Sequence, residues 1–382
     1  METTTSPANG NTPSHIVFIE LLRGIASLIV VWDHLVAIWG DSHAVQFLPL
    51  YIVREYITKP LGIIQDFGYF GVAIFFFVSG FIITYVAQRE QRTAFIVKRV
   101  LRIYPPLIAS IFLIVATSYI YTWATQSNSF ADIRQLNWRQ ILFSMTLWNY
   151  FFLPQNVVNG VAWSLVIEEI FYAISFILLP WLKSQPRVVS LACSIIVLVI
   201  IRLSRALGDN FFLFAASSAY IPLLLIGQAT FFRWSGRITQ LEFGALLLLN
   251  YGLFVYGLRH IHVNFYPVTN SYAISTMYAY LLFVIALLLN DRIVIPRILK
   301  FYSKISYSMY LNHGHTGSLL LTIMYPYIGF SAALVVAFSG VTAISYASWR
   351  YIERPFQLAA RAMLEHWHAF QLRERPKKAT AP

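Results

Sequence analysis

The stretch IVFIELLRGIASLIVVWDHLVAI, residues 16–38, decides the organisation of this chain. It is apolar over most of its length, and about 20 such residues in a helix cross a hydrocarbon core roughly 30 Å thick. Four ionisable side chains nevertheless interrupt it: Glu20, Arg23, Asp33 and His34. A charge at the bilayer centre costs at least about 2.5–3.5 kcal/mol, and a polar stripe on a spanning helix has to face protein or water. The stretch therefore predicts a membrane-spanning helix whose polar face is turned into a helix bundle.

The same apolar pattern recurs along the chain. Nine further runs are long enough to span, at residues 69–86, 103–124, 161–182, 188–207, 211–232, 241–258, 272–289, 305–325 and 327–347. Residues 141–153 are apolar but too few to span, so we expect an interfacial or re-entrant piece there. The pattern predicts an all-α, polytopic transmembrane helix bundle with about ten spanning helices.

Three regions are expected from the distribution of these runs. Residues 1–15, rich in Ser, Thr, Pro and Asn, are expected to be a disordered N-terminal tail. Residues 16–350 form the transmembrane domain, and residues 351–382 form a cytoplasmic tail in which an amphipathic helix precedes a basic end.

Composition excludes a soluble protein and argues against a nucleic-acid binder. Hydrophobic residues make up 58% of the chain and charged residues 12%, whereas soluble proteins are about half apolar and a quarter charged. The net charge of +12 comes from Lys and Arg in short clusters between the apolar runs. Most of them fall in one of the two alternating sets of loops, so the positive-inside rule predicts that both termini are cytoplasmic.

Arg23 and His34 share one face of the first helix. They are eleven positions apart, and at about 100° per residue this brings them back to within roughly 20° of each other after three turns, with a rise of about 16 Å. Glu20 and Ser27 fall close to the same stripe, whereas Asp33 does not. A structural interpretation, an ion pair between Glu20 and Arg23 beside a hydrogen-bonded histidine, remains open.

The fourth apolar run opens with Trp163-Ser164-Leu165 and places Glu168 one or two turns inside the membrane, near the expected depth of His34. A carboxylate that faces an imidazole fixes its tautomer and stabilises its protonated form, as a general base requires. The alternative is a carboxylate at a helix end.

Arg99 and Arg102 follow the second apolar run, three residues apart on one helical face, just before an expected break at Pro105 and Pro106. Paired guanidinium groups can hold the phosphates of a cytoplasmic donor. Ordinary anchoring at the membrane surface is the alternative.

In their order along the chain, these segments resemble acyltransferase family 3, the membrane O-acyltransferases that modify bacterial surface polysaccharides, nodulation factors and some antibiotics. The resemblance covers about residues 16–356 and lies in six motifs. These are Arg23 with His34, Gly71-Val72 with Phe75 to Phe81, Arg99 with Arg102, Trp163-Ser164-Leu165 with Glu168, Ser306 to His313, and Tyr351 to Phe356. Two positions depart from the family pattern: Ala73, where many members carry an acidic residue, and Asn312, where a bulkier residue is common.

The resemblance implies a multi-pass protein of the bacterial inner membrane that transfers an acyl group, expected to be acetyl, from acyl-CoA to a hydroxyl of a saccharide. On this basis we expect His34 to act as general base or transient acyl carrier, with Glu168 orienting or charging it, Arg23 supporting the acyl path electrostatically, and Arg99 and Arg102 holding the donor phosphates. Ser79, Tyr310, Asn312 and His313 are secondary candidates.

No metal is expected, because the nine histidines show no ligand spacing. Two other functions remain open: a transporter or flippase of a glycan intermediate, and a small-molecule acyltransferase of the macrolide-modifying type.

Overall fold

The computed structural model describes residues 16–126, 137–153, 155, 157–261 and 269–374, and within these ranges the regular structure is helical. Nine helical segments in the described part are long and apolar enough to cross a membrane. The first joins α1 (Val17–Trp32), a π-helical turn η1 (Asp33–Ile38) and α2 (Trp39–Ser42). The others are α5 (Gly68–Ala87), α6 (Arg92–Thr125), α8 (Trp163–Ser184), α9 (Pro186–Leu203), α10 (Asp209–Ser218) with α11 (Ile221–Trp234), α12 (Gln240–His260), α13 (Thr269–Leu288) and α14 (Arg297–Ser348). The chain is a multi-pass membrane protein.

The long helix α14 contains two passes. Its 52 residues are interrupted at Gly329, whose φ of 72° breaks the helical path. Beyond that point the chain returns along itself: the Phe301 ring stacks on Tyr346 with centroids 6.0 Å apart, and the hydroxyls of Tyr302 and Thr342 lie 3.5 Å apart. The nine helical segments therefore make ten passes, in agreement with the sequence prediction.

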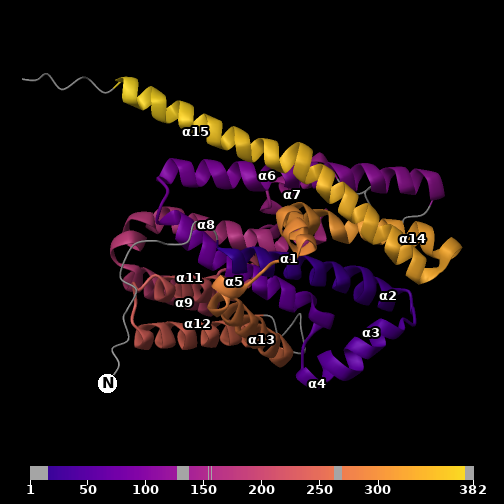
Figure 1. The fold of residues 1–382 in the computed structure, drawn as a ribbon, viewed down its shortest axis with the longest axis horizontal. Coiled ribbons are helices and arrows are strands. Elements are labelled where there is room, and N and C mark those ends of the chain that lie inside the picture. The colour runs from indigo at the N-terminus through magenta and orange to yellow at the C-terminus, as the bar shows by residue number, and fades with distance from the viewer. Residues whose placement is uncertain (1–15, 127–136, 154, 156, 262–268, 375–382) are drawn as a thin grey trace, which may run out of the picture.

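Helix α5 lies at the centre of the bundle. Figure 1 shows α1 and α5 running through the middle, with α6 and α15 (Arg354–Glu374) along one side and α9, α11, α12 and α13 along the other. Most side chains of α5 are buried. It crosses α11 closely, because a Cβ atom at Gly80 or Gly227 would collide with a backbone carbonyl of the opposite helix, that of Leu224 or Phe77. Small residues permit such contact between membrane helices.

Helix α1 lies between α5 and α14, and this placement turns its polar face into protein. At Gly24 an added Cβ would lie only 2.6 Å from the Leu299 carbonyl oxygen of α14. On the α5 side, an added Cβ at Gly71 would lie 2.8 Å from Val30. The ionisable groups of α1 are thus held between two helices rather than exposed to lipid.

The predicted break at Pro105 and Pro106 is wrong, because α6 continues through both prolines. A proline removes one backbone N–H, and in membrane helices side chains of neighbouring helices supply replacement donors. The two prolines leave the carbonyls of Leu101 and Arg102 without their usual N–H donor, and Tyr307 of α14 packs against the same turn, donating its hydroxyl to the Ile103 carbonyl at 2.8 Å. Arg99 and Arg102 consequently lie within a spanning helix and not in a loop.

Shorter elements complete the described chain. Of the run predicted to be interfacial or re-entrant, residues 141–153, only the short helix α7 (Trp138–Met145) and the turn Trp148–Tyr150 are helical. Between α2 and α5 lie α3 (Leu48–Val53), the π-helical turn η2 (Arg54–Thr58), α4 (Lys59–Leu61) and the turn η3 (Gln65–Phe67). The π-helical turn η9 (Trp349–Glu353) leads into α15, the helix expected in the tail. Residues 1–15, expected to be a disordered tail, and 375–382, the basic end, lie outside the described residues.

Candidate active site

Three cavities follow one another along α1. The first, here named the basic vestibule, has a volume of about 610 Å³ and is lined by Glu20, Lys98, Lys300, Lys304 and Glu353 among others. The second, the middle cavity, measures about 100 Å³ and shares Arg23, Arg99 and Arg102 with the vestibule. The third, the histidine cavity, measures about 170 Å³, contains His34, and shares Val72 and Tyr310 with the middle cavity.

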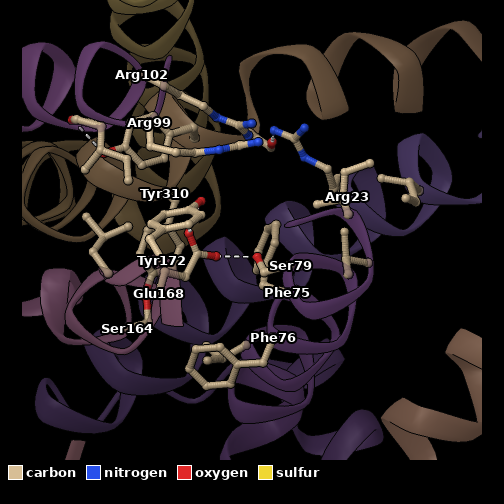
Figure 2. Close-up of a pocket in the computed structure, with 18 residues that line it drawn as sticks. Arg23, Phe75, Phe76, Ser79, Arg99, Arg102, Ser164, Glu168, Tyr172 and Tyr310 are labelled. Atoms are coloured by element: carbon tan, nitrogen blue, oxygen red, sulfur yellow. Dashed lines mark hydrogen bonds between the residues drawn. The ribbon is translucent and has the colours of Figure 1, made fainter. Parts of the chain in front are cut away.

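The three arginines meet at the wall between the first two cavities. Figure 2 shows Arg99 and Arg102 reaching from one side and Arg23 from the other, with their guanidinium groups converging. Arg23 donates a hydrogen bond to the Ser306 hydroxyl at 2.8 Å, and Arg99 lies over the rings of Phe95 and Tyr172.

This arginine cluster lacks a full set of partners. Arg99 is 8% exposed, and its Nε atom is buried without a hydrogen-bond partner. Among the described residues, the ion pairs of the structure do not include Arg23, Arg99 or Arg102. A guanidinium group without a carboxylate partner, such as that of Arg99, is free to bind an anionic ligand.

Two carboxylates balance part of this charge. Glu353 and Glu168 both act electrostatically on Arg23 and Arg102. Glu353 is buried and accepts a hydrogen bond from the Ser308 hydroxyl at 2.8 Å. Glu168 lines the middle cavity and accepts hydrogen bonds from Ser79 and, at 3.4 Å, from Tyr172, as Figure 2 shows for Ser79.

The predicted pairing of Glu168 with His34 is not what the structure has. Glu168 lines the middle cavity and His34 the histidine cavity. The ring beside His34 is that of His313, with centroids 4.6 Å apart and the planes perpendicular. The pairing was predicted because Glu168 and His34 are expected at similar depths in the membrane. Depth alone does not determine the direction in which a side chain points.

His313 is held in one tautomer. Its Nδ1 atom lies 2.8 Å from the Tyr310 carbonyl oxygen, and a carbonyl can only accept, so Nδ1 carries the proton. The Nε2 atom is then an unprotonated acceptor, and it is buried without a partner. The two histidines thus present a basic nitrogen next to a second imidazole.

The remaining secondary candidates differ in what they contact. Tyr310 lies between the middle and histidine cavities, shares a 2.8 Å hydrogen bond with Ser164 and donates to the Val161 carbonyl at 2.7 Å. Asn312 is buried, donates to the Ser308 carbonyl of its own helix and lines none of the three cavities. The departure from the family pattern at Asn312 therefore lies outside the three cavities.

Several cavity residues were not found by sequence reasoning. Asp33 lines the histidine cavity, although regular α-helical spacing predicts that it lies off the face that carries His34. The structure differs because η1 begins at Asp33, and the wider π-helical turn rotates successive residues by fewer degrees. Three residues of the basic vestibule were also missed. In the sequence, Lys300 and Lys304 look like ordinary positive charges near a helix end, and Glu353 is only part of a short C-terminal motif.

The site provides acid–base and anion-binding groups. In the described part of the chain, no group of three His, Cys, Asp or Glu side chains gathers as metal ligands would. The arrangement combines an arginine cluster suited to a phosphate-bearing ligand with an imidazole about 16 Å from Arg23 along the first spanning segment, in η1. Such an arrangement can hold a charged donor at one end and deprotonate a nucleophile at the other.

Comparisons with known proteins identify the family of the chain. The family model described as "Acyltransferase domain", that of acyltransferase family 3, matches residues 16–350. Nodulation protein 10 of Rhizobium leguminosarum bv. viciae is 24% identical over 374 residues, which cover 91% of this chain and 95% of that protein. No solved structure matches. The chain belongs to acyltransferase family 3 and is a multi-pass membrane acyltransferase.

Proposed function

We propose that the protein transfers an acetyl group from acetyl-CoA to a hydroxyl of a saccharide in the bacterial cell envelope. The observation that carries the proposal is the arginine cluster, in which Arg99 is buried and Arg23 and Arg102 are half-buried, and which lacks ion-pair partners in the described chain and lines the basic vestibule. Phosphates are the natural complement of such a cluster, because guanidinium groups bind them with paired, charge-assisted hydrogen bonds.

Coenzyme A fits the basic vestibule and the adjoining middle cavity on chemical grounds. Its phosphates would lie in the basic vestibule and against Arg99 and Arg102, and its thioester arm would enter the middle cavity. That cavity is narrower and has apolar walls from Phe75, Phe76 and Ile82. Glu168, fixed by Ser79 and Tyr172, offsets the positive charge there without approaching His34.

His34 acts as the general base in this proposal. It takes the proton from the acceptor hydroxyl, and the oxygen attacks the thioester carbonyl. The carbon–sulfur bond then breaks, and the departing thiolate takes up a proton to leave free CoA. His313, beside His34 and held in one tautomer, supports the imidazole in place of the expected Glu168.

The proposal also assigns a location. The protein would lie in the bacterial inner membrane with both termini in the cytoplasm, as the clustering of Lys and Arg favours. The basic vestibule, lined by Lys98, Lys300 and Lys304, would then open to cytoplasmic acyl-CoA, and the histidine cavity would lie toward the opposite side.

The test uses purified full-length protein in detergent, labelled acetyl-CoA and a panel of methyl glycosides as acceptors. The wild type is expected to form labelled esters. His34→Ala should lower transfer by at least about 100-fold, in the range of general base catalysis, while CoA binding stays within twofold. His366→Ala, which removes an exposed histidine on α15, is the matched control and should transfer normally. Near-normal transfer by His34→Ala would show that the assignment is wrong, and movement of unmodified glycan without acyl-CoA would favour a transporter.

A further inference from the structure

Asp33 has a buried carboxylate, and the proposed mechanism assigns it no role. It is 4% exposed and lines the histidine cavity next to His34. Its Oδ1 atom is buried and has no hydrogen-bond partner in the structure. Buried polar atoms are almost always satisfied, so an unpaired oxygen on a carboxylate that lines a cavity points to a donor that comes with the ligand.

The local backbone is built to hold this carboxylate against the cavity. The π-helical turn η1 begins at Asp33 and directs both Asp33 and His34 to the same space. On the opposite side stands Gly68, the first residue of α5, where any Cβ would collide with the Asp33 carboxylate. The first turn of the 20-residue helix α5 therefore lies directly against the carboxylate.

The segment that precedes Gly68 is strained and firmly held. Gln65, Asp66 and Phe67 all have positive φ, at 55°, 44° and 79°, which non-glycine residues adopt at a cost in free energy. Arg54 fixes the segment with hydrogen bonds of 2.6 and 2.8 Å to Asp66. The Gln65 amide, which also lines the cavity, donates to the Tyr272 hydroxyl at 3.1 Å. Strain of this kind persists where the surroundings enforce a required geometry.

The other walls of the histidine cavity are mainly aromatic. Tyr69 and Tyr272 meet with centroids 4.7 Å apart, and Trp163 and Tyr220 with centroids 5.4 Å apart. A cavity with aromatic walls and a few fixed polar groups suits a ring that has an apolar face and hydroxyls at its edge.

We propose that Asp33 positions the acceptor by accepting a hydrogen bond from a second hydroxyl, adjacent to the hydroxyl that His34 deprotonates. The inference rests on the proposed function and specifies its substrate class, which is an acceptor with two neighbouring hydroxyls. An acceptor with a single hydroxyl would leave Asp33 unpaired in the bound state, and sites built around such a hydrogen bond discriminate strongly against analogues that lack it.

The experiment compares each methyl glycoside of the panel with its single-deoxy analogues, using purified full-length protein and labelled acetyl-CoA. For the wild type, removal of the hydroxyl next to the acetylated one should lower kcat/KM by about 100-fold. Asp33→Ala should lower kcat/KM for the parent glycoside by a similar factor and reduce its preference over the deoxy analogue to within about threefold. Its KM for acetyl-CoA should remain unchanged.

Two further variants separate positioning from folding. Asp33→Asn keeps an acceptor oxygen in the same place and should restore part of the activity and of the preference for the parent. Glu55→Ala, which removes a carboxylate paired with Lys59 outside the cavity, should behave as the wild type. A wild-type preference for the parent glycoside in Asp33→Ala would overturn this inference alone. A wild type that binds acetyl-CoA but acetylates none of the glycosides would overturn the proposed function, and this inference with it.

Discussion

The proposed chemistry of this protein uses arginine and histidine residues, whose positions inside a membrane are energetically expensive. Arg99 is buried with an unpaired Nε, and Arg23 is supported by a neutral hydroxyl, that of Ser306. Leaving such groups without an anion costs free energy, which supports the proposal that an anionic ligand completes the cluster. The distinction between Arg and Lys matters here, because only the guanidinium fork can hold a phosphate with two parallel hydrogen bonds.

At Arg99 we predict a measurable loss of donor affinity. Arg99→Ala removes a charge-assisted hydrogen bond worth about 1.5–3 kcal/mol, so the Kd for CoA should rise about 10- to 100-fold. Arg99→Lys keeps the charge but loses the fork, and should recover only part of this. Calorimetric titration of CoA into the purified protein measures both. Arg233→Ala, an exposed arginine bonded to Gln240, should bind CoA normally. Unchanged CoA affinity in Arg99→Ala would remove Arg99 from the donor site.

At the scale of helices, the bundle depends on close crossings around α5. Gly80 and Gly227 bring α5 and α11 into backbone contact, and Gly24 does the same for α1 and α14. The middle cavity lies beside these crossings, and its lining comes from α1, α5, α6, α8 and α14.

A single methyl group at the α5–α11 crossing should destabilise the fold. In Gly227→Ala the added Cβ meets the Phe77 carbonyl, a backbone atom that cannot move aside alone. Overpacking of this kind costs about 1–3 kcal/mol, so thermal unfolding in detergent should occur at a lower temperature. Gly244→Ala is the matched control, because nothing lies within 4 Å of its added Cβ. Equal unfolding temperatures for the two variants would show that the crossing is looser than the structure indicates.

Much at the helix scale could be predicted from sequence, because bilayer thickness sets the length of each apolar run. The ten passes and the inward direction of Arg23 and His34 follow from that constraint and from the cost of charge in lipid. Three features could not be predicted, for physical reasons. The turn at Asp33 departs from α-helical spacing, the Pro105–Pro106 segment stays helical beside Tyr307, and the partner of His34 depends on how α14 is rotated against α1.

At the scale of the whole molecule, the three cavities form one series across the bundle. Glu20 in the basic vestibule and His34 in the histidine cavity are fourteen residues apart on the first spanning segment, a rise of about 21 Å. The arginine cluster and Tyr310 stand at the two boundaries between successive cavities. An acyl group that moved through this series would cross much of a 30 Å hydrocarbon core inside one protein.

The central claim is that donor and acceptor reach the site from opposite faces of the membrane. Liposomes reconstituted with the purified protein test it directly, with labelled acetyl-CoA added outside and the best methyl glycoside acceptor trapped inside. We predict that labelled ester accumulates within the liposomes, and that His34→Ala abolishes it. Ester that forms only when donor and acceptor share the same side would contradict a transfer path along α1.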